Sequence, residues 1–150
     1  MLVPGAKGLT RRRPMPPRHP LVVVVEDNAD MNRAMDSMLQ AAGFETAMFF
    51  SAESLLGAGV PADTACLVLD VHLPGVTGFE LYDRLAATDP PRPVIFMTAY
   101  DEPAARAQSK EAGAVAYLTK PFPGKQLIET IDRVIRSMRV TKGSNPVGKD

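Results

Sequence analysis

Several kinds of residue are scarce in this chain of 150 residues, and each shortage excludes a class of protein. Tryptophan is absent and cysteine occurs once, as Cys66, which excludes an intramolecular disulfide and a zinc site built from thiolates. No apolar run approaches the roughly 18 residues that span a bilayer. No apolar core of a secretory signal follows the N-terminal arginines. We therefore expect a cytoplasmic protein that does not enter a membrane.

The formal net charge of zero hides an uneven distribution along the chain. Residues 1–20 carry five basic residues, no acidic ones and five of the 14 prolines, which predicts a disordered basic leader. Residues 21–139 hold 16 acidic and 10 basic residues, and we expect them to form one folded domain. Residues 140–150 contain glycine, proline and polar residues, which indicates a tail or the start of a linker. Because the body is acidic, we expect no direct binding of nucleic acid.

Short apolar runs alternate with segments of helical spacing through this domain. The runs have the β-branched and aromatic character of buried strands, and they lie at 21–25, 44–49, 65–69, 93–97 and 115–118. Helical spacing follows each run, at 31–42, 51–57, 79–85, 104–112 and 127–138. Thr77 and Glu80 have the spacing of a capping box. The alternation predicts an α/β fold, with a parallel sheet covered by helices on both faces.

Polar side chains follow four of the predicted strands at the point where each strand ends. They are Glu26, Asp27, Asp70, Thr98 and Lys120. Because the carboxyl ends of parallel strands meet at one edge of the sheet, we expect these side chains to converge. Three carboxylates in one crevice would repel one another unless a hard cation such as Mg²⁺ joined them. Lys120 and Thr98 suit the oxygens of a phosphoryl group, and Asp70 could accept that group as an acyl phosphate.

Each of these residues alone also has a structural explanation, since acids after strands commonly cap helices and form turns. Independent loops have no structural reason to deliver all five to one edge, so their convergence favours a functional site. The phosphate-binding patterns G-x-x-x-x-G-K-[ST] and G-x-G-x-x-G are absent, as is the hydrolase pattern G-x-S-x-G. Nucleotide binding and a serine nucleophile therefore lose support.

Four motifs surround the strand ends: Val-Val-Val-Glu-Asp-Asn at 23–28, Leu-Asp-Val-His-Leu-Pro-Gly-Val-Thr-Gly at 69–78, Phe-Met-Thr-Ala at 96–99 and Tyr-Leu-Thr-Lys-Pro-Phe at 117–122. In this order and spacing they resemble the phosphoacceptor receiver domain of bacterial two-component response regulators. The chain looks most like the receivers of nitrogen-fixation-type regulators. The resemblance implies a flavodoxin-like, doubly wound fold with five parallel strands in the order 2-1-3-4-5.

The resemblance also implies a phosphoacceptor and a set of metal ligands. Asp70 would accept the phosphoryl group. Glu26, Asp27, Asp70 and the backbone carbonyl of His72 would bind Mg²⁺, with Mn²⁺ as an alternative.

Further residues would bind the phosphoryl group and change conformation with it. Lys120 and Thr98 would bind the phosphoryl oxygens, and Thr98 and Tyr117 would form the switch. The peptide bond before Pro121 would be cis. The side chains of His72 and Tyr100 would flank the path of the hydrolytic water, which predicts a long-lived phosphoryl group.

The partners implied by the resemblance are other signalling proteins. A sensor histidine kinase or a phosphotransfer protein would donate the phosphoryl group. The switched surface, formed by the helix at 104–112, the strand at 115–118 and the helix at 127–138, would signal to a downstream protein or to an output domain absent from this chain, or form a homodimer. The chain would catalyse only its own phosphorylation and dephosphorylation, so we do not expect a turnover enzyme.

Three other functions remain open from the residues alone. A receiver-like scaffold would bind partners without being phosphorylated, although it would need none of the strand-end residues. A haloacid-dehalogenase-type phosphatase wants a second acid two residues after the nucleophile, where His72 stands. A flavin-binding module would need a Ser/Thr-rich phosphate loop after the first strand, which the chain lacks.

Overall fold

The structure is a computed structural model that describes residues 19–144, with side chains as far as residue 138. The predicted leader therefore lies outside the described residues, apart from His19 and Pro20. The Pro20 carbonyl accepts a hydrogen bond from the Glu45 amide at 2.9 Å, so the chain adjoins the sheet from this residue onward. Within the described part, no helix has the length and apolar character needed to cross a membrane.

The described residues contain a five-stranded parallel sheet in the order β3-β2-β4-β5-β6. Its strands are β2 (Leu21–Val25), β3 (Glu45–Phe49), β4 (Thr64–Asp70), β5 (Val94–Thr98) and β6 (Ala116–Thr119). This order confirms the predicted order 2-1-3-4-5. Every residue of β2 and β5 is buried, because helices cover both faces of the sheet. Continuous apolar runs were therefore a reliable sign of these strands.

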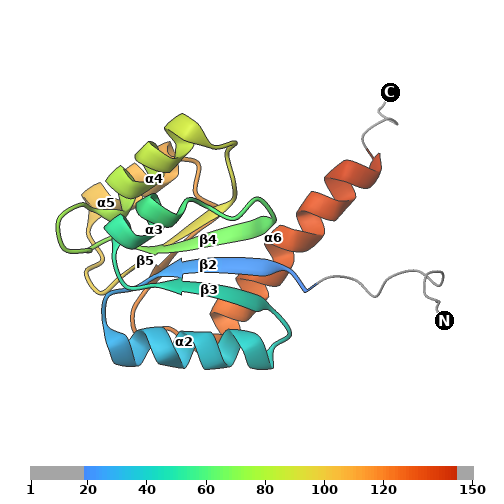
Figure 1. Cartoon of the computed structure of the whole chain (residues 1–150), viewed down its shortest axis with the longest axis horizontal. Helices are drawn as coiled ribbons and strands as arrows, with labels where there is room; N and C mark the ends of the chain where they lie inside the picture. Colours follow the sequence, from blue (N-terminus) through green and yellow to red (C-terminus); the bar gives the residue numbers. More distant parts are fainter. Residues whose placement is uncertain (1–18, 145–150) are drawn as a thin grey trace, which may run out of the picture.

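Five helices cover the sheet, divided between its two faces (Figure 1). They are α2 (Ala29–Ala41), α3 (Ala52–Ala58), α4 (Gly78–Thr88), α5 (Pro103–Glu111) and α6 (Gly124–Ser144). The helices α3, α4 and α5 cover one face, and α2 and α6 cover the other (Figure 1). The predicted capping box at the start of α4 is confirmed, since the Thr77 and Glu80 side chains each accept a hydrogen bond from the other residue's amide.

The last helix is longer than the sequence pattern predicts. We expected the folded domain to end at residue 139, whereas α6 continues to Ser144. No proline interrupts the chain between Pro123 and Pro146, so nothing removes a backbone donor from the extra turn. The remaining part of the predicted tail, 145–150, lies outside the described residues.

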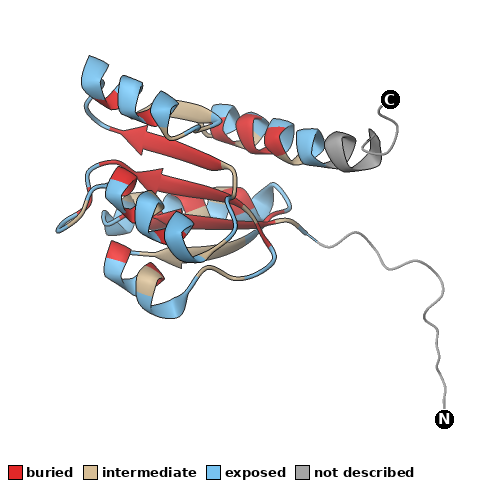
Figure 2. Ribbon diagram, turned by 90° about the horizontal axis from the view of Figure 1, so that it is seen from above, coloured by how far each residue is buried: buried red, intermediate tan, exposed pale blue. Residues whose placement is uncertain are grey.

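Two hydrophobic cores fix the sheet between its helices, and the inner strands β2, β4 and β5 are the most continuously buried part of the described residues (Figure 2). The edge strands β3 and β6 are mostly half-buried. One core joins β-strand residues such as Leu69 and Phe96 to Leu81 of α4. The other joins Val24 to Leu39 of α2 and Ile131 of α6. Because both cores are close-packed, the carboxyl ends of the strands cannot shift independently.

We predict that Cys66 is chemically inert in the folded protein. It is fully buried in β4, and burial raises the pKa of its thiol to about 12. With such a pKa the reactive thiolate would be on the order of one molecule in ten thousand at pH 8. A thiol-reactive dye should label the native protein far more slowly than the same protein in denaturant. Equal labelling rates in the two conditions would contradict this assignment.

Candidate functional site

The candidate site lies at the carboxyl edge of the sheet, where the arrowheads of the strands end (Figure 1). Glu26 and Asp27 directly follow β2, Asp70 is the last residue of β4, and Lys120 directly follows β6. The structure brings these four side chains together. Thr98 ends β5 at the same edge, although its hydroxyl is bonded elsewhere.

Lys120 connects two buried carboxylates. Its Nζ donates to Glu26 Oε1 at 2.6 Å and to Asp70 Oδ2 at 2.8 Å. The side chains of Glu26 and Asp70 are only 1% and 5% exposed, and that of Lys120 is 17% exposed. Carboxylates this far from water need a partner, because an unpaired buried charge is strongly unfavourable. The Lys120–Pro121 peptide bond is cis, as the resemblance implied.

The protonation behaviour of this network follows from burial and pairing. Burial raises the pKa of Glu26, against the hydrogen bonds from Lys120 and the Asn28 amide, which lower it. Burial alone would lower the pKa of Lys120, but its hydrogen bonds to Asp70 and Glu26 raise it above the ordinary value. Lys120 is therefore a fixed ammonium at neutral pH.

Three carboxylates at this edge could together hold a metal ion. Oxygen atoms of Glu26, Asp27 and Asp70 all lie within 4.8 Å of one another. Asp27 is exposed, whereas the other two are buried, so the cluster opens to solvent on one side. An all-oxygen donor set with room for water is the arrangement that Mg²⁺ prefers. The residues present therefore fit a hard divalent cation.

His72 contacts Asp70 through its backbone and forms an aromatic pair with Tyr100. The backbone amide of His72 donates to Asp70 Oδ1 at 3.0 Å. Its ring meets the Tyr100 ring edge-on, with centroids 5.2 Å apart and planes at 87°. Tyr100 is 61% exposed and His72 is exposed as well, so the pair faces solvent.

Thr98 and Tyr117 are not joined to the acidic cluster in this structure. The buried Thr98 hydroxyl donates to the Tyr100 carbonyl at 3.2 Å and accepts from the Tyr100 amide at 3.0 Å. The Tyr117 ring lies under the Arg106 guanidinium, 4.8 Å from the ring centroid. Arg106 is in turn held by Asp101 through bonds of 2.7 and 2.9 Å.

Two residues that support the site were missed by the sequence analysis. Gly78 packs against the backbone of Asp70, since a Cβ there would lie 2.4 Å from the Asp70 carbonyl oxygen. Asn32 donates to the backbone at the ends of β2 and β3. A signal for Asn32 exists, because it shares a helical face with the buried Met35 and Leu39 and is the one polar residue there.

We predict that Gly78→Ala disturbs the site. The added methyl group meets the backbone of Asp70 and Val71 rather than a flexible side chain, so overpacking should lower the free energy of unfolding by about 1–3 kcal/mol. Gly57→Ala in α3 is the control, because no atom lies within 4 Å of its added Cβ. That control should raise stability by about 0.5–1 kcal/mol. Urea denaturation followed by circular dichroism measures both, and equal effects would contradict the close approach.

Comparison with known proteins gives one family. The sequence profile of the response regulator receiver domain family matches residues 22–132. Nodulation protein W of Bradyrhizobium diazoefficiens is 35% identical over 111 residues, which are 74% of this chain and 49% of that protein. The transcriptional regulatory protein FixJ of the same organism is 32% identical over 129 residues, which are 86% of this chain and 63% of that protein. The chain thus spans about half to two thirds of the length of these relatives.

Solved structures agree with this likeness. A CheY-like receiver domain from Methanospirillum hungatei superimposes with a TM-score of 0.75 at 23% identity, covering 81% of this chain and 97% of that one. The BeF3-activated receiver domain of DrrB superimposes with a TM-score of 0.71 at 28% identity, covering 79% and 98%. The first of these similarities establishes the fold, and the regulators above agree with the predicted nitrogen-fixation-type resemblance.

Proposed function

Because this chain belongs to the response regulator receiver domain family, we propose that it accepts a phosphoryl group on Asp70 and signals through a surface that responds to that group. The observation that carries the proposal is the network in which Lys120 contacts both Asp70 and Glu26 beside the exposed Asp27. A buried carboxylate with a cation on one side and an opening on the other can act as a nucleophile toward a donor arriving from solvent.

The chemistry that we propose is phosphoryl transfer from a phosphohistidine. A carboxylate oxygen of Asp70 forms the new bond to phosphorus, the phosphorus–nitrogen bond breaks, and the imidazole leaves with its electron pair and takes up a proton from water. Lys120 stabilises the negative charge on the transferring group, because it is a fixed ammonium within hydrogen-bond distance of Asp70.

The proposed metal ligands are Glu26, Asp27, Asp70 and the backbone carbonyl of His72. Mg²⁺, or Mn²⁺ in its place, would supply positive charge near the phosphoryl oxygens. The acidic cluster supports this assignment, since among the described residues its only ion-pair partner is Lys120, which binds Glu26 and Asp70. In this scheme the chain is modified itself and is not a turnover enzyme.

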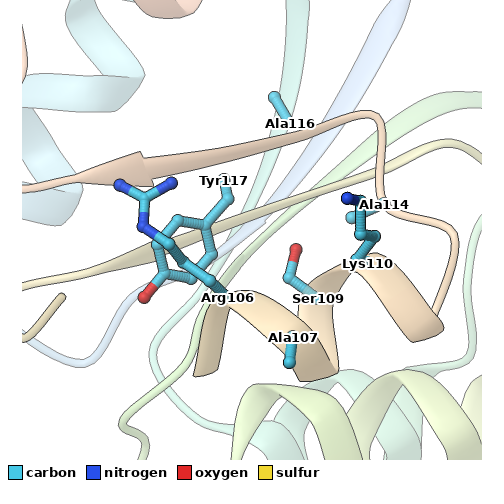
Figure 3. A pocket seen from close by; sticks show the side chains of 7 residues that line it. All are labelled: Arg106, Ala107, Ser109, Lys110, Ala114, Ala116 and Tyr117. Atoms are coloured by element: carbon cyan, nitrogen blue, oxygen red, sulfur yellow. The ribbon is translucent and has the colours of Figure 1, made fainter. Parts of the chain in front are cut away.

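The proposed switch starts from the resting bonds of Thr98 and Tyr117. The Thr98 hydroxyl would exchange its bonds to Tyr100 for a bond to a phosphoryl oxygen, and the Tyr117 ring would move into the space that is vacated. The ring borders a hollow of about 460 Å³ between α5 and β6, with Arg106 and Lys110 at its rim (Figure 3). Movement of Tyr117 would therefore change the α5-β6-α6 surface.

The proposed partners follow from family membership and from the relatives. The donor would be a sensor histidine kinase or a phosphotransfer protein. The switched surface would contact a downstream protein, an output domain or a second copy of this chain. Transcriptional regulators such as FixJ are longer than this chain, which supports an output function in a further segment or another protein.

We predict that Asp70→Asn abolishes phosphorylation. Wild-type protein incubated with Mg²⁺ and acetyl phosphate should gain one phosphoryl group in an intact-mass measurement, and the variant should gain none, because an amide is not a comparable nucleophile. Asp63→Asn is the matched control, since Asp63 is exposed and precedes the opposite end of β4. The control should behave as the wild type.

Other outcomes of this experiment are informative. If no protein gains mass, even with a phosphorylated kinase as donor, the phosphorylation-independent scaffold becomes the better description. If Asp70→Asn gains mass like the wild type, Asp70 is not the acceptor.

We predict that the phosphoryl group is long-lived because His72 and Tyr100 exclude water. Their rings meet edge-on, Tyr100 is exposed, and the His72 amide donates to Asp70. Tyr100→Ala should shorten the lifetime several-fold, and Tyr100→Phe should preserve it, because phenylalanine keeps the ring contact. Intact mass followed over time after removal of the donor measures this lifetime. Loss within seconds that Tyr100→Ala leaves unchanged would remove the basis of the prediction.

A further inference from the structure

Asn32 is a buried polar residue on the face of α2 that packs against the sheet. It is 2% exposed, and the other buried residues of this helix are Met35 and Leu39. A buried amide is unfavourable unless its hydrogen bonds are made. The partners of its side chain therefore indicate what the residue does.

The Asn32 amide group joins the ends of two strands. Its Nδ2 donates to the Glu26 carbonyl at 3.0 Å and to the Phe49 carbonyl at 3.1 Å. Phe49 is the last residue of β3, and Glu26 follows the last residue of β2. The Phe49 carbonyl also accepts from the Glu26 amide at 3.0 Å. The side chain of Asn32 thus binds the two chain segments together just beyond the last paired residues of β2 and β3.

These bonds complete the support around Glu26. Its backbone amide is held by Phe49, its carbonyl by Asn32, and its two carboxylate oxygens by Lys120 and the Asn28 amide, the last at 3.0 Å. Every polar group of Glu26 has a partner. The direction in which the next residue, Asp27, presents its carboxylate depends on this same stretch of backbone.

We propose that Asn32 is a positioning residue that holds Glu26 and Asp27 in the orientation required to bind a divalent cation. The inference rests on the proposed function, which assigns these acids to the metal. Two N–H donors on one short side chain are needed to reach both carbonyls. Aspartate at neutral pH and leucine, both of similar size, have no such donors.

A purely structural role for Asn32 would have different consequences. If it only satisfied two buried carbonyls, its loss would lower stability and leave cation binding unchanged in the folded protein. If Asn32 positions the acids, its loss weakens cation binding more than does a substitution elsewhere that lowers stability by the same amount. Residues that orient metal ligands typically contribute about 10- to 100-fold in affinity.

The test measures binding of Mg²⁺ alone by isothermal titration calorimetry, together with thermal unfolding. Asn32→Leu should raise the Kd for Mg²⁺ about tenfold. Met35→Ala is the control, because Met35 is buried on the same helix face and lies outside the hydrogen-bonded network. It should lower the unfolding temperature without changing the Kd. If Asn32→Leu does not fold, Asn32→Ser takes its place in the test, because serine is small and polar but has only one donor. This variant should also raise the Kd for Mg²⁺.

Two results would overturn the inference while leaving the proposed function intact. One is a wild-type Kd in both Asn32 variants, and the other is an equal loss of affinity in Met35→Ala. If the wild-type protein binds no Mg²⁺, the proposed function fails as well, and the role of Asn32 fails with it.

Discussion

The salt bridges of Lys120 are the interaction on which the candidate site depends. They join the end of β6 to carboxylates that lie 94 and 50 residues away in the chain. Glu26 and Asp70 are almost completely buried, and loss of one partner from a buried ion pair typically costs about 3–5 kcal/mol. The acids are therefore tolerated only while the sheet holds its strand ends in register. Packing of the two cores, one of which includes Val25 beside Glu26 and both Leu69 and Val71 beside Asp70, is what makes this charge arrangement stable.

The parallel sheet explains why the candidate site residues lie at one edge. Its central strands are buried on both faces, so polar side chains have no place along them and collect where the strands end. The loops at that edge then supply backbone donors to the acids. The His72 amide binds Asp70, and the Asn28 amide binds Glu26. Each acid is thus oriented by the start of the segment that follows its own strand.

Much of this arrangement could be predicted from the sequence, because burial on both faces leaves continuous apolar runs and because strand ends can be located within a residue or two. The positions of Glu26, Asp70 and Lys120 at one edge followed from that reasoning. The contacts of Asn32 did not, since they depend on how the first turns of α2 sit against β3. The same holds for Gly78, whose importance is visible only once the Asp70 backbone lies against it.

Thr98 and Tyr117 differ in how their hydroxyl groups are hydrogen-bonded. The Thr98 hydroxyl is satisfied twice by the Tyr100 backbone. The Tyr117 hydroxyl is buried, and no hydrogen bond of standard geometry reaches it from a described residue. Burial raises the pKa of this hydroxyl, and the Glu102 amide partly offsets that rise. The Tyr117 ring is therefore placed by its contact with Arg106 and by its packing against the core under α3, α4 and α5, and not by its hydroxyl.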